Sequence, residues 1–358
     1  MIRLLIVDDS ALMRRHLKNQ FEAEGDFEIC FARNGLEAVA ENRDFKPDAV
    51  TLDINMPEMD GLTALSLIMA ERPVPVVMVS SLTEKGALAT FEALNLGAVD
   101  YVAKPDGTIS LSIDTIRHEL VSKVRTAAKA KLKLKGGSAT SLSARLRADR
   151  ESIASQRRPL IRRGGVSGLG FVVIGVSTGG PRTLEEILPS LPADFPWPIF
   201  IAQHMPAAFT KSFAERLDHI CELRVSEVSQ PRVVEPGNIY LGRGGTDMVL
   251  ANRVGRLHVL PKPECPQMLY HPSVELLGRS VLESCDPARV IGVMLTGMGN
   301  DGAEAFAAIK NHGGRTIAES EETAVVFGMP KELIDADGAS LVLPMNKIVA
   351  QLRTWARE

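Results

Sequence analysis

The residues with the clearest potential for chemistry lie where an apolar segment stops abruptly at a serine. The segment FVVIGVSTGGP is apolar from Phe171 to Val176 and then changes to Ser177, with glycines and Pro181 behind it. Glycine permits a sharp turn and close approach of a substrate, and proline suits the first turn of a helix. The serine oxygen is therefore expected at a helix N-terminus, where unpaired N–H groups can stabilise an oxyanion. Serine is also a common helix N-cap, so this segment alone leaves both interpretations open.

Two further polar residues follow apolar segments and supply the partners that a serine nucleophile needs. His204 ends PIFIAQH, and Asp301 follows VIGVMLTGMGN. Side chains at the carboxyl ends of parallel strands meet at one edge of a sheet, where ligands bind. A histidine can take the serine proton, and a carboxylate can orient the histidine. The chain order Ser, His, Asp differs from that of α/β-hydrolases. Asp301 could instead cap the helix that runs through Ala303 and Phe306.

A second group of polar residues ends apolar segments in the first third of the chain. These residues are Asp8, Asp9, Asp53, Ser80 and Lys104. Helical patterns lie between the segments, over Ala11–Glu24, Gly35–Asp44, Gly61–Glu71 and Thr83–Leu96. The alternation predicts a parallel sheet with helices on both faces. Crowded carboxylates favour Mg²⁺, while the lysine and the serine hydroxyl can bind a phosphoryl group. Each aspartate alone could also be a loop or cap residue.

Length and composition narrow the class of protein. The chain has 358 residues, enough for two domains, with 45% hydrophobic and 24% charged residues as in soluble globular proteins. The net charge of −3 gives no electrostatic argument for nucleic-acid binding. The four cysteines have no metal-binding spacing and indicate reduced thiols in the cytoplasm. No signal peptide or bilayer-spanning segment is expected, and therefore no membrane insertion.

The pattern along the chain predicts two domains and a linker. Residues 1–123 form the first unit, residues 124–168 are rich in Lys, Arg, Gly and Ser, and residues 169–358 return to strands and helices. The middle stretch is typical of a solvated tether, although its charges could contact an acidic partner or a membrane surface. The second unit is expected to be doubly wound α/β, with an antiparallel hairpin in NIYLGRGGTDMVLANRVGRLHVL. Its C-terminal part predicts a helix over Val274–Ser284 and a strand over Val290–Leu295.

With LDINMPEMDGL intact, residues 1–123 resemble the receiver domain of two-component response regulators. The resemblance implies a flavodoxin-like, doubly wound sheet of five parallel strands. It implies that Asp53 accepts a phosphoryl group from a CheA-type histidine kinase. Mg²⁺ would be held by Asp8, Asp9, Asp53 and the Asn55 carbonyl. Ser80 and Lys104 would respond to phosphorylation.

The second half resembles the CheB family of chemotaxis methylesterases. The matching segments spread over residues 171–330 and are GVSTGGP, AQHMP, PGNIYL, HPSVELL, LTGMGNDGA and ETAVVFGMP. The resemblance implies that glutamate methyl esters on methyl-accepting chemotaxis receptors are hydrolysed and that some receptor glutamines are deamidated, without a cofactor. Ser177 matches the nucleophile, His204 the base and Asp301 the orienting acid, while Thr178 and the Met298 N–H support the site. In this family the unphosphorylated receiver covers the active site, and we expect a monomer.

Two features depart from the family pattern and leave alternatives open. His271 stands where relatives often carry arginine, and the linker is long and basic. The same chemistry could therefore serve a chemosensory pathway other than the flagellar one. A non-catalytic binding protein is a second alternative. A transcription factor would need a basic recognition helix, and a metallohydrolase would need HExxH or paired-cysteine spacing.

Overall fold

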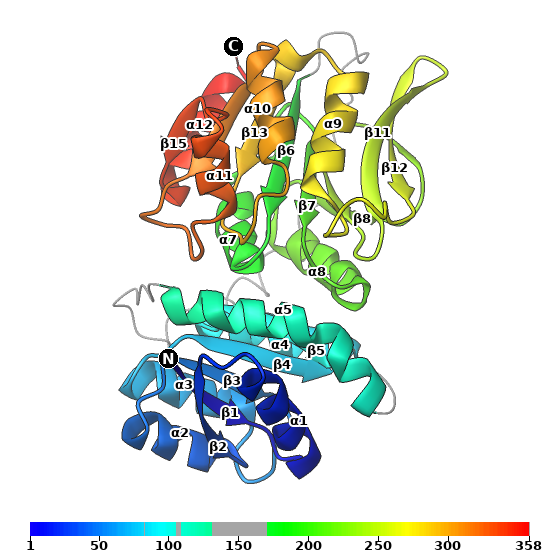
Figure 1. Ribbon diagram of the computed structural model, residues 1–358. Helices are drawn as coiled ribbons and strands as arrows, with labels where there is room; N and C mark the ends of the chain where they lie inside the picture. Colours follow the sequence, from blue (N-terminus) through cyan, green and yellow to red (C-terminus); the bar gives the residue numbers. More distant parts are fainter. Residues whose placement is uncertain (82, 105–108, 131–169, 358) are drawn as a thin grey trace.

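A computed structural model describes residues 1–81, 83–104, 109–130 and 170–357 of the chain. These residues form two α/β units, each built on a parallel sheet (Figure 1). The α/β class expected from the sequence is therefore confirmed. Most of the predicted linker, residues 124–168, lies outside the described residues. Its first residues belong to a helix that ends at Lys129.

The N-terminal unit is a sheet of five parallel strands in the order β2-β1-β3-β4-β5. Its strands are β1 (Ile2–Val7), β2 (Phe27–Ala32), β3 (Ala49–Asp53), β4 (Val76–Ser81) and β5 (Asp100–Lys104). Its helices are α1 (Ala11–Glu22), α2 (Gly35–Asp44), α3 (Gly61–Glu71), α4 (Glu84–Leu96) and α5 (Ile109–Lys129). The side chains of Ser10, Asn34 and Asp60 each accept a backbone N–H in the first turn of the helix that follows. Such caps pair N–H groups that would otherwise lack a partner in the first turn, and so fix where each helix begins after its loop.

The C-terminal unit has a larger parallel sheet in the order β15-β14-β13-β6-β7-β10-β8. Its strands are β6 (Phe171–Val176), β7 (Ile199–Gln203), β8 (Arg224–Val228), β10 (Asn238–Gly242), β13 (Val290–Met294), β14 (Arg315–Glu319) and β15 (Leu341–Leu343). The chain moves outward from β6 in one direction and later returns to β13 on its other side. The carboxyl ends of β7, β6 and β13 thus lie side by side at the point where the winding direction changes, which is the usual ligand position in such sheets.

Helices cover this sheet, and a small antiparallel sheet stands beside it. The helices are α7 (Gly180–Ile187), α8 (Ala207–Ile220), α9 (Val274–Ser284), α10 (Ala303–Asn311), α11 (Met329–Asp335) and α12 (Met345–Trp355), with 3₁₀ turns at Leu188–Ser190 and Pro287–Arg289. The antiparallel sheet contains β11 (Asp247–Arg253), β12 (Arg256–Lys262) and β9 (Arg232–Val233). The predicted hairpin is present as β11 and β12, but β10 pairs in parallel with β7 and β8. Assigning β10 to the hairpin was therefore wrong.

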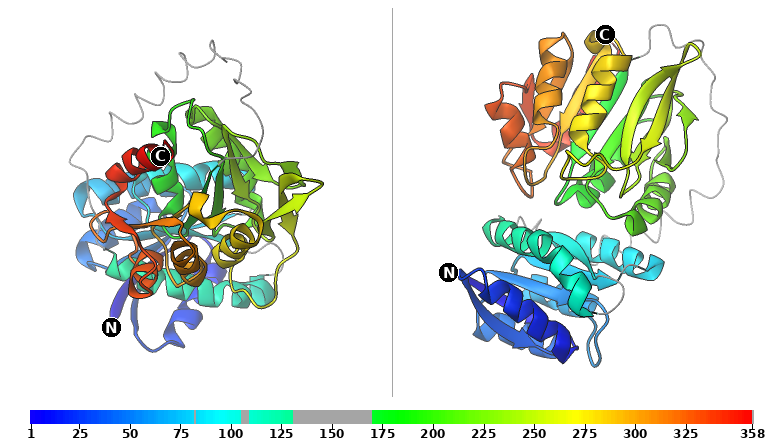
Figure 2. Two further views of the ribbon diagram at one scale, coloured as in Figure 1. Left: turned by 90° about the horizontal axis from the view of Figure 1, so that it is seen from above. Right: turned by 45° about the vertical axis from the view of Figure 1, so that its right-hand side comes forward.

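The two units pack together where α4 of the N-terminal unit meets α7 and α8 of the C-terminal unit, and where α5 contacts the loop at Met298. Figure 1 shows α5 and α4 between the N-terminal sheet and the second unit, and the side view in Figure 2 agrees. The Phe91 ring on α4 lies 5.2 Å from the ring of Phe213 and 6.3 Å from that of Phe209, both on α8. Tyr101 on β5 also packs on Phe209, with ring centroids 4.9 Å apart. One apolar cluster therefore continues from the first unit into the second.

No helix within the described ranges is long and apolar enough to cross a membrane.

Candidate functional site

Ser177 occupies the turn between β6 and α7, as its sequence context predicts. Its N–H donates to the Thr296 carbonyl at 3.0 Å, and its carbonyl accepts from Gly180 N at 2.8 Å and Gln203 Nε2 at 3.0 Å. Gly179 has φ +78°, and a Cβ there would lie 2.7 Å from the Val325 side chain. The turn thus requires glycine for both its backbone angle and its packing. It leaves the serine side chain at the carboxyl edge of the sheet.

His204 and Asp301 form a close pair at the same edge. His204 Nε2 lies 2.8 Å from Asp301 Oδ2, and the two side chains are 8% and 10% exposed. The carboxylate also accepts from Val274 N at 2.7 Å, Glu275 N at 3.0 Å and Ser273 Oγ at 3.0 Å. These donors lie at the N-terminus of α9, where the helix dipole favours a negative charge. Asp301 therefore holds the imidazole on one side and the start of α9 on the other.

The charge of Asp301 is stabilised in this position. Burial raises the pKa of a carboxyl group, but the hydrogen bonds from His204 and from the α9 N–H groups oppose it. The balance lowers the pKa of Asp301 below its ordinary value. Asp301 is thus a carboxylate at neutral pH and can orient an imidazole.

The structure brings Ser177, His204 and Asp301 to three neighbouring strand ends. The His204 N–H donates to the Val176 carbonyl at 3.1 Å, which joins the serine turn to the histidine turn. His204 Nδ1 is buried and has no hydrogen-bond partner, so the link between serine and histidine is open in this structure. Catalytic hydrogen bonds are often long before substrate binds. Asp301 is not the cap of α10, because Gly302 occupies that position.

The two predicted supporting residues contact the N-terminal unit. Thr178 Oγ1 donates to Asp100 Oδ2 on β5 at 2.7 Å, and this hydrogen bond is buried. The Met298 sulfur accepts from the hydroxyls of Ser122 at 3.2 Å and Thr126 at 3.0 Å, both on α5. Thr178 and Met298, the two predicted supporting residues, are therefore covered by β5 and α5 of the N-terminal unit.

The predicted acidic site is present in the N-terminal unit. Carboxylate oxygens of Asp8, Asp9 and Asp53 all lie within 4.8 Å of one another. Lys104 Nζ lies 2.9 Å from Asp8 Oδ2 and 2.8 Å from Asp53 Oδ2. Burial raises the pKa of Asp53, although Lys104 opposes the shift. Burial would lower the pKa of Lys104, but the two carboxylates raise it overall.

The donor set of this site fits a divalent cation. Its ligand atoms are carboxylate oxygens, the hard donors that Mg²⁺ prefers, and one lysine does not balance three carboxylates. The Asn55 side chain is exposed just beyond β3. Ser80 is buried, and its hydroxyl donates to the Gly86 carbonyl at 3.3 Å. The predicted residues are thus at one sheet edge, with Ser80 turned toward the start of α4.

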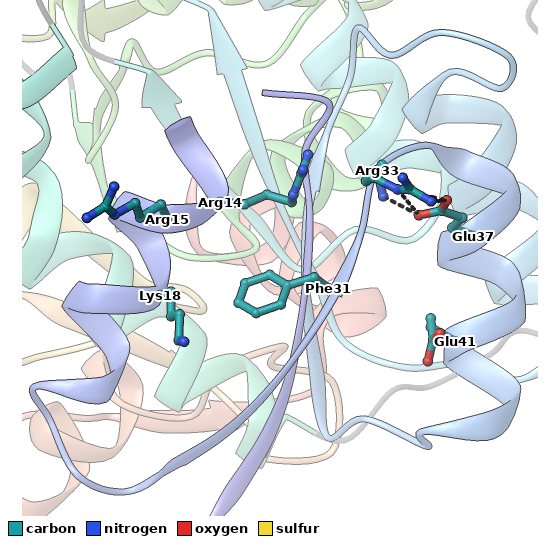
Figure 3. Close-up of a pocket in the computed structure, with 7 residues that line it drawn as sticks. All are labelled: Arg14, Arg15, Lys18, Phe31, Arg33, Glu37 and Glu41. Atoms are coloured by element: carbon teal, nitrogen blue, oxygen red, sulfur yellow. Dashed lines mark hydrogen bonds and ion pairs between the residues drawn. The ribbon is translucent and has the colours of Figure 1, made fainter. Parts of the chain in front are cut away.

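A shallow hollow of about 630 Å³ lies over α1, β2 and α2 (Figure 3). It is lined by Arg14, Arg15, Lys18, Phe31, Arg33, Glu37 and Glu41. In Figure 3 the Phe31 ring lies between the basic side chains of α1 and the Arg33–Glu37 pair. Arg14 donates to the carbonyls of Asp8 and Asp9 at 2.6 and 3.0 Å, so this basic surface borders the acidic site.

Sequence reasoning missed three residues around the serine edge. Tyr270 stacks on the His204 ring, with centroids 4.3 Å apart and planes at 12°. Asp100 and Lys123 form a buried ion pair of 3.3 Å beside Thr178. Burial disfavours the Lys123 charge, but Asp100 and Glu119 raise its pKa well above the ordinary value. The sequence signal for these three residues is limited to Asp100, an aspartate that begins the apolar segment DYVA.

Comparison with known proteins identifies both units. Residues 172–352 match the family described as CheB methylesterase, and residues 4–112 match the response regulator receiver domain. Protein-glutamate methylesterase/protein-glutamine glutaminase 3 of Rhodospirillum rubrum is 54% identical over 360 residues, covering 99% of this chain and 96% of that protein. A similarly named protein of Caldanaerobacter subterraneus is 49% identical, with 97% and 94% covered.

A solved structure supports the fold of the second unit. The crystal structure of the Thermotoga maritima CheB methylesterase catalytic domain aligns with a TM-score of 0.50 and 41% identity, covering 52% of this chain and 98% of that one. The resemblance expected from the sequence is therefore confirmed. The chain belongs to the CheB methylesterase family, with a receiver domain preceding the methylesterase domain.

Proposed function

We propose that this protein hydrolyses glutamate methyl esters, and deamidates certain glutamines, on methyl-accepting chemotaxis receptors in the cytoplasm. The full-length relatives carry the names of both activities. The observation that carries the proposal is the His204–Asp301 pair beside the Ser177 turn. The same chemistry could serve a non-flagellar chemosensory pathway. We keep the division into residues 1–123, 124–168 and 169–358, with a monomer as the working unit.

Ser177 is assigned as the nucleophile and His204 as the base. His204 Nε2 is hydrogen-bonded to the Asp301 carboxylate, so Nδ1 is the ring nitrogen that remains to accept the serine proton. Ser177 Oγ bonds to the ester carbonyl carbon, the bond to the methoxy group breaks, and His204 returns the proton to release methanol. Water then attacks the acyl-enzyme by the same route and regenerates the serine. For a glutamine side chain the leaving group is ammonia.

The Met298 N–H is assigned as an oxyanion donor beside the turn of Thr178. The preceding residue, Gly297, donates to the Val326 carbonyl at 3.0 Å, and its carbonyl accepts from Gly328 N and Met329 N. A Cβ at Gly297 would lie 2.8 Å from Ser177 Cβ. The fixed backbone and the close approach support a preorganised donor next to the serine.

The receiver is assigned as a phosphorylation switch acted on by a CheA-type kinase. Asp53 is the acceptor, and Asp8, Asp9 and the Asn55 carbonyl would hold Mg²⁺ with it. The ion would supply positive charge to the incoming phosphoryl group. Lys104 already binds the Asp53 carboxylate and can move to a phosphoryl oxygen, while the Ser80 hydroxyl can leave the Gly86 carbonyl to donate to it.

The packing of the two domains supports inhibition by the unphosphorylated receiver. The bonds from Asp100 to Thr178 and from α5 to Met298 place the receiver on both residues that flank the proposed nucleophile site. A methylated receptor segment could not occupy the same space. Phosphorylation would favour an undocked arrangement and open the serine edge.

Methanol release from methylated receptors tests the function. We expect release by the full chain to rise when acetyl phosphate and Mg²⁺ are added, and Ser177→Ala to lower it by several orders of magnitude. Ser177→Ala should fold normally because only one hydroxyl is lost. A folded Ser177→Ala variant with about a tenth of the normal turnover would remove Ser177 as the nucleophile. No methanol release by the wild-type protein would favour the non-catalytic binding alternative.

A further inference from the structure

Tyr270 lies against the face of the proposed catalytic base. Its ring is parallel to the His204 imidazole within 12°, with the centroids 4.3 Å apart. The neighbouring Leu269 is 81% exposed, whereas Tyr270 itself is only partly exposed. Tyrosine in this short irregular segment thus turns inward to a catalytic ring while the residue before it faces solvent.

The segment that carries Tyr270 is fixed at both ends by one buried carboxylate. Asp247 on β11 is 1% exposed and accepts from Cys265 N and from Ser273 N, both at 2.9 Å. It also lies 3.1 Å from His271 Nδ1, next to Tyr270. Ser273 in turn donates to Asp301. The tyrosine and the orienting acid are therefore attached to the same rigid start of α9.

The single hydrogen bond to Asp301 does not fix the plane of the His204 ring. The torsion that turns an imidazole is broad and about two-fold, so a bond at Nε2 leaves rotation about that contact. Nδ1 must point at the serine hydroxyl for proton transfer, and here it has no partner to hold it. A flat ring packed on one face supplies the missing constraint.

The same ring can stabilise the charge that forms on the base. His204 becomes an imidazolium when it takes the serine proton, and an aromatic face attracts a cation placed above it. The charged groups near this stack are Asp301 on the methylesterase side and Lys123 and Glu119 on α5. Lys123 pairs with Glu119 at 2.9 Å and with Asp100 at 3.3 Å, so its charge is balanced on the receiver side. Asp301 and the tyrosine face are in direct contact with the His204 ring.

We propose that Tyr270 is a positioning residue that holds the His204 ring in the plane needed for proton transfer and stabilises its cationic form. This inference rests on the proposed function. It predicts that turnover depends on the aromatic face of Tyr270 and does not depend on its phenol hydroxyl. It also predicts an effect on turnover rather than on substrate binding, because the imidazolium forms only after substrate is bound.

The test compares Tyr270→Phe with Tyr270→Leu in the full chain, using methylated receptors with acetyl phosphate and Mg²⁺. Tyr270→Phe keeps the ring and should stay within about twofold of the wild-type kcat. Tyr270→Leu should lower kcat about tenfold with KM unchanged, as expected for a lost cation–π contact at a buried site. Tyr270→Met gives a second ringless variant if Tyr270→Leu does not fold.

Three results would overturn the assignment. One is a folded ringless variant with wild-type kcat. Another is a Tyr270→Phe variant as slow as Tyr270→Leu. The third is a ringless variant whose unphosphorylated rate rises, because this would make Tyr270 an inhibitory contact of the receiver. Wild-type and Ser177→Ala proteins run in parallel separate these from failure of the proposed function: without serine-dependent methanol release, the function fails and this assignment fails with it.

Discussion

Truncating Phe91 to alanine should release the methylesterase from its receiver without phosphorylation. Phe91 is 1% exposed because its ring fills the space between α4 and α8. Its contacts with Phe209 and Phe213 are both aromatic pairs, each worth about 0.5–1.5 kcal/mol beyond the buried area. Losing both pairs weakens docking by at least about 1–3 kcal/mol, which is about 5- to 150-fold in the docking equilibrium, and the apolar contact area that the ring no longer buries adds to this.

The assay is methanol release by unphosphorylated full-length protein. We expect the Phe91→Ala rate to rise by a factor in that range, up to the rate of the phosphorylated wild-type protein. Acetyl phosphate should then add little, because the serine edge is already open. Phe91→Leu keeps most of the apolar volume, so its unphosphorylated rate should lie between those of the wild-type protein and Phe91→Ala.

A matched control separates docking from receiver stability. Leu17 on α1 is also 1% exposed, but it packs in a cluster that contains neither Phe91 nor its partners on α8. Leu17→Ala should cost about 2–5 kcal/mol of receiver stability and leave the unphosphorylated rate unchanged while the receiver stays folded. A folded Phe91→Ala variant with the wild-type unphosphorylated rate would refute inhibition by the docked receiver.

Three further predictions follow from the sites. Asp301→Asn should keep the size of the side chain but favour the wrong imidazole tautomer, lowering kcat by about 10⁴, and near-normal kcat would remove Asp301 from the triad. Because the folded-state pKa of Asp301 is lowered, its stabilisation is present above the unfolded value of about 4 and is lost as pH falls below it. The urea unfolding midpoint should therefore fall less between pH 5 and pH 3 in Asp301→Asn than in the wild-type protein. An equal fall in the two proteins would contradict this assignment. Asp53→Asn, or chelation of Mg²⁺ by EDTA, should abolish activation by acetyl phosphate and leave basal methanol release intact, whereas retained activation would place the switch elsewhere.

The strand ends were the predictable part of the proposed site. A buried parallel strand is a nearly continuous apolar run, so the first polar residue after it marks the carboxyl edge of the sheet. The rule places Ser177 and His204 directly after β6 and β7, whereas Asp301 follows β13 only after a short loop that also contains Thr296. It also located Asp53 and Lys104, which the structure joins by an ion pair of 2.8 Å.

Pairing between distant segments was not predictable in the same way. The alternation of apolar and polar residues in β10 fits a hairpin strand and a parallel strand equally well. Only its pairing with β7 and β8 shows that it is a parallel strand. Tyr270 belongs to a segment without regular structure, so no period points to its partner. Asp100 and Thr178 are separated by 78 positions of sequence that include the linker. Nothing local in either segment indicates that they are in contact.

The contacts between the domains offer a route by which the proposed phosphorylation of Asp53 would affect the serine edge. Lys104, which binds Asp53, ends the same strand that Asp100 begins, and Asp100 binds Thr178 next to the proposed nucleophile. Proximity alone does not couple two sites; coupling needs an element with two arrangements that both sites bias. The docked receiver is one such arrangement, because α4, α5 and β5 form its contact face. A receptor segment bound at the serine edge would disfavour the docked arrangement, and so would a phosphoryl group on Asp53 that drew Lys104 toward it. By reciprocity, a bound methylated segment should shift the equilibrium between unphosphorylated and phosphorylated receiver toward the phosphorylated form, by the same factor that phosphorylation adds to the affinity for that segment.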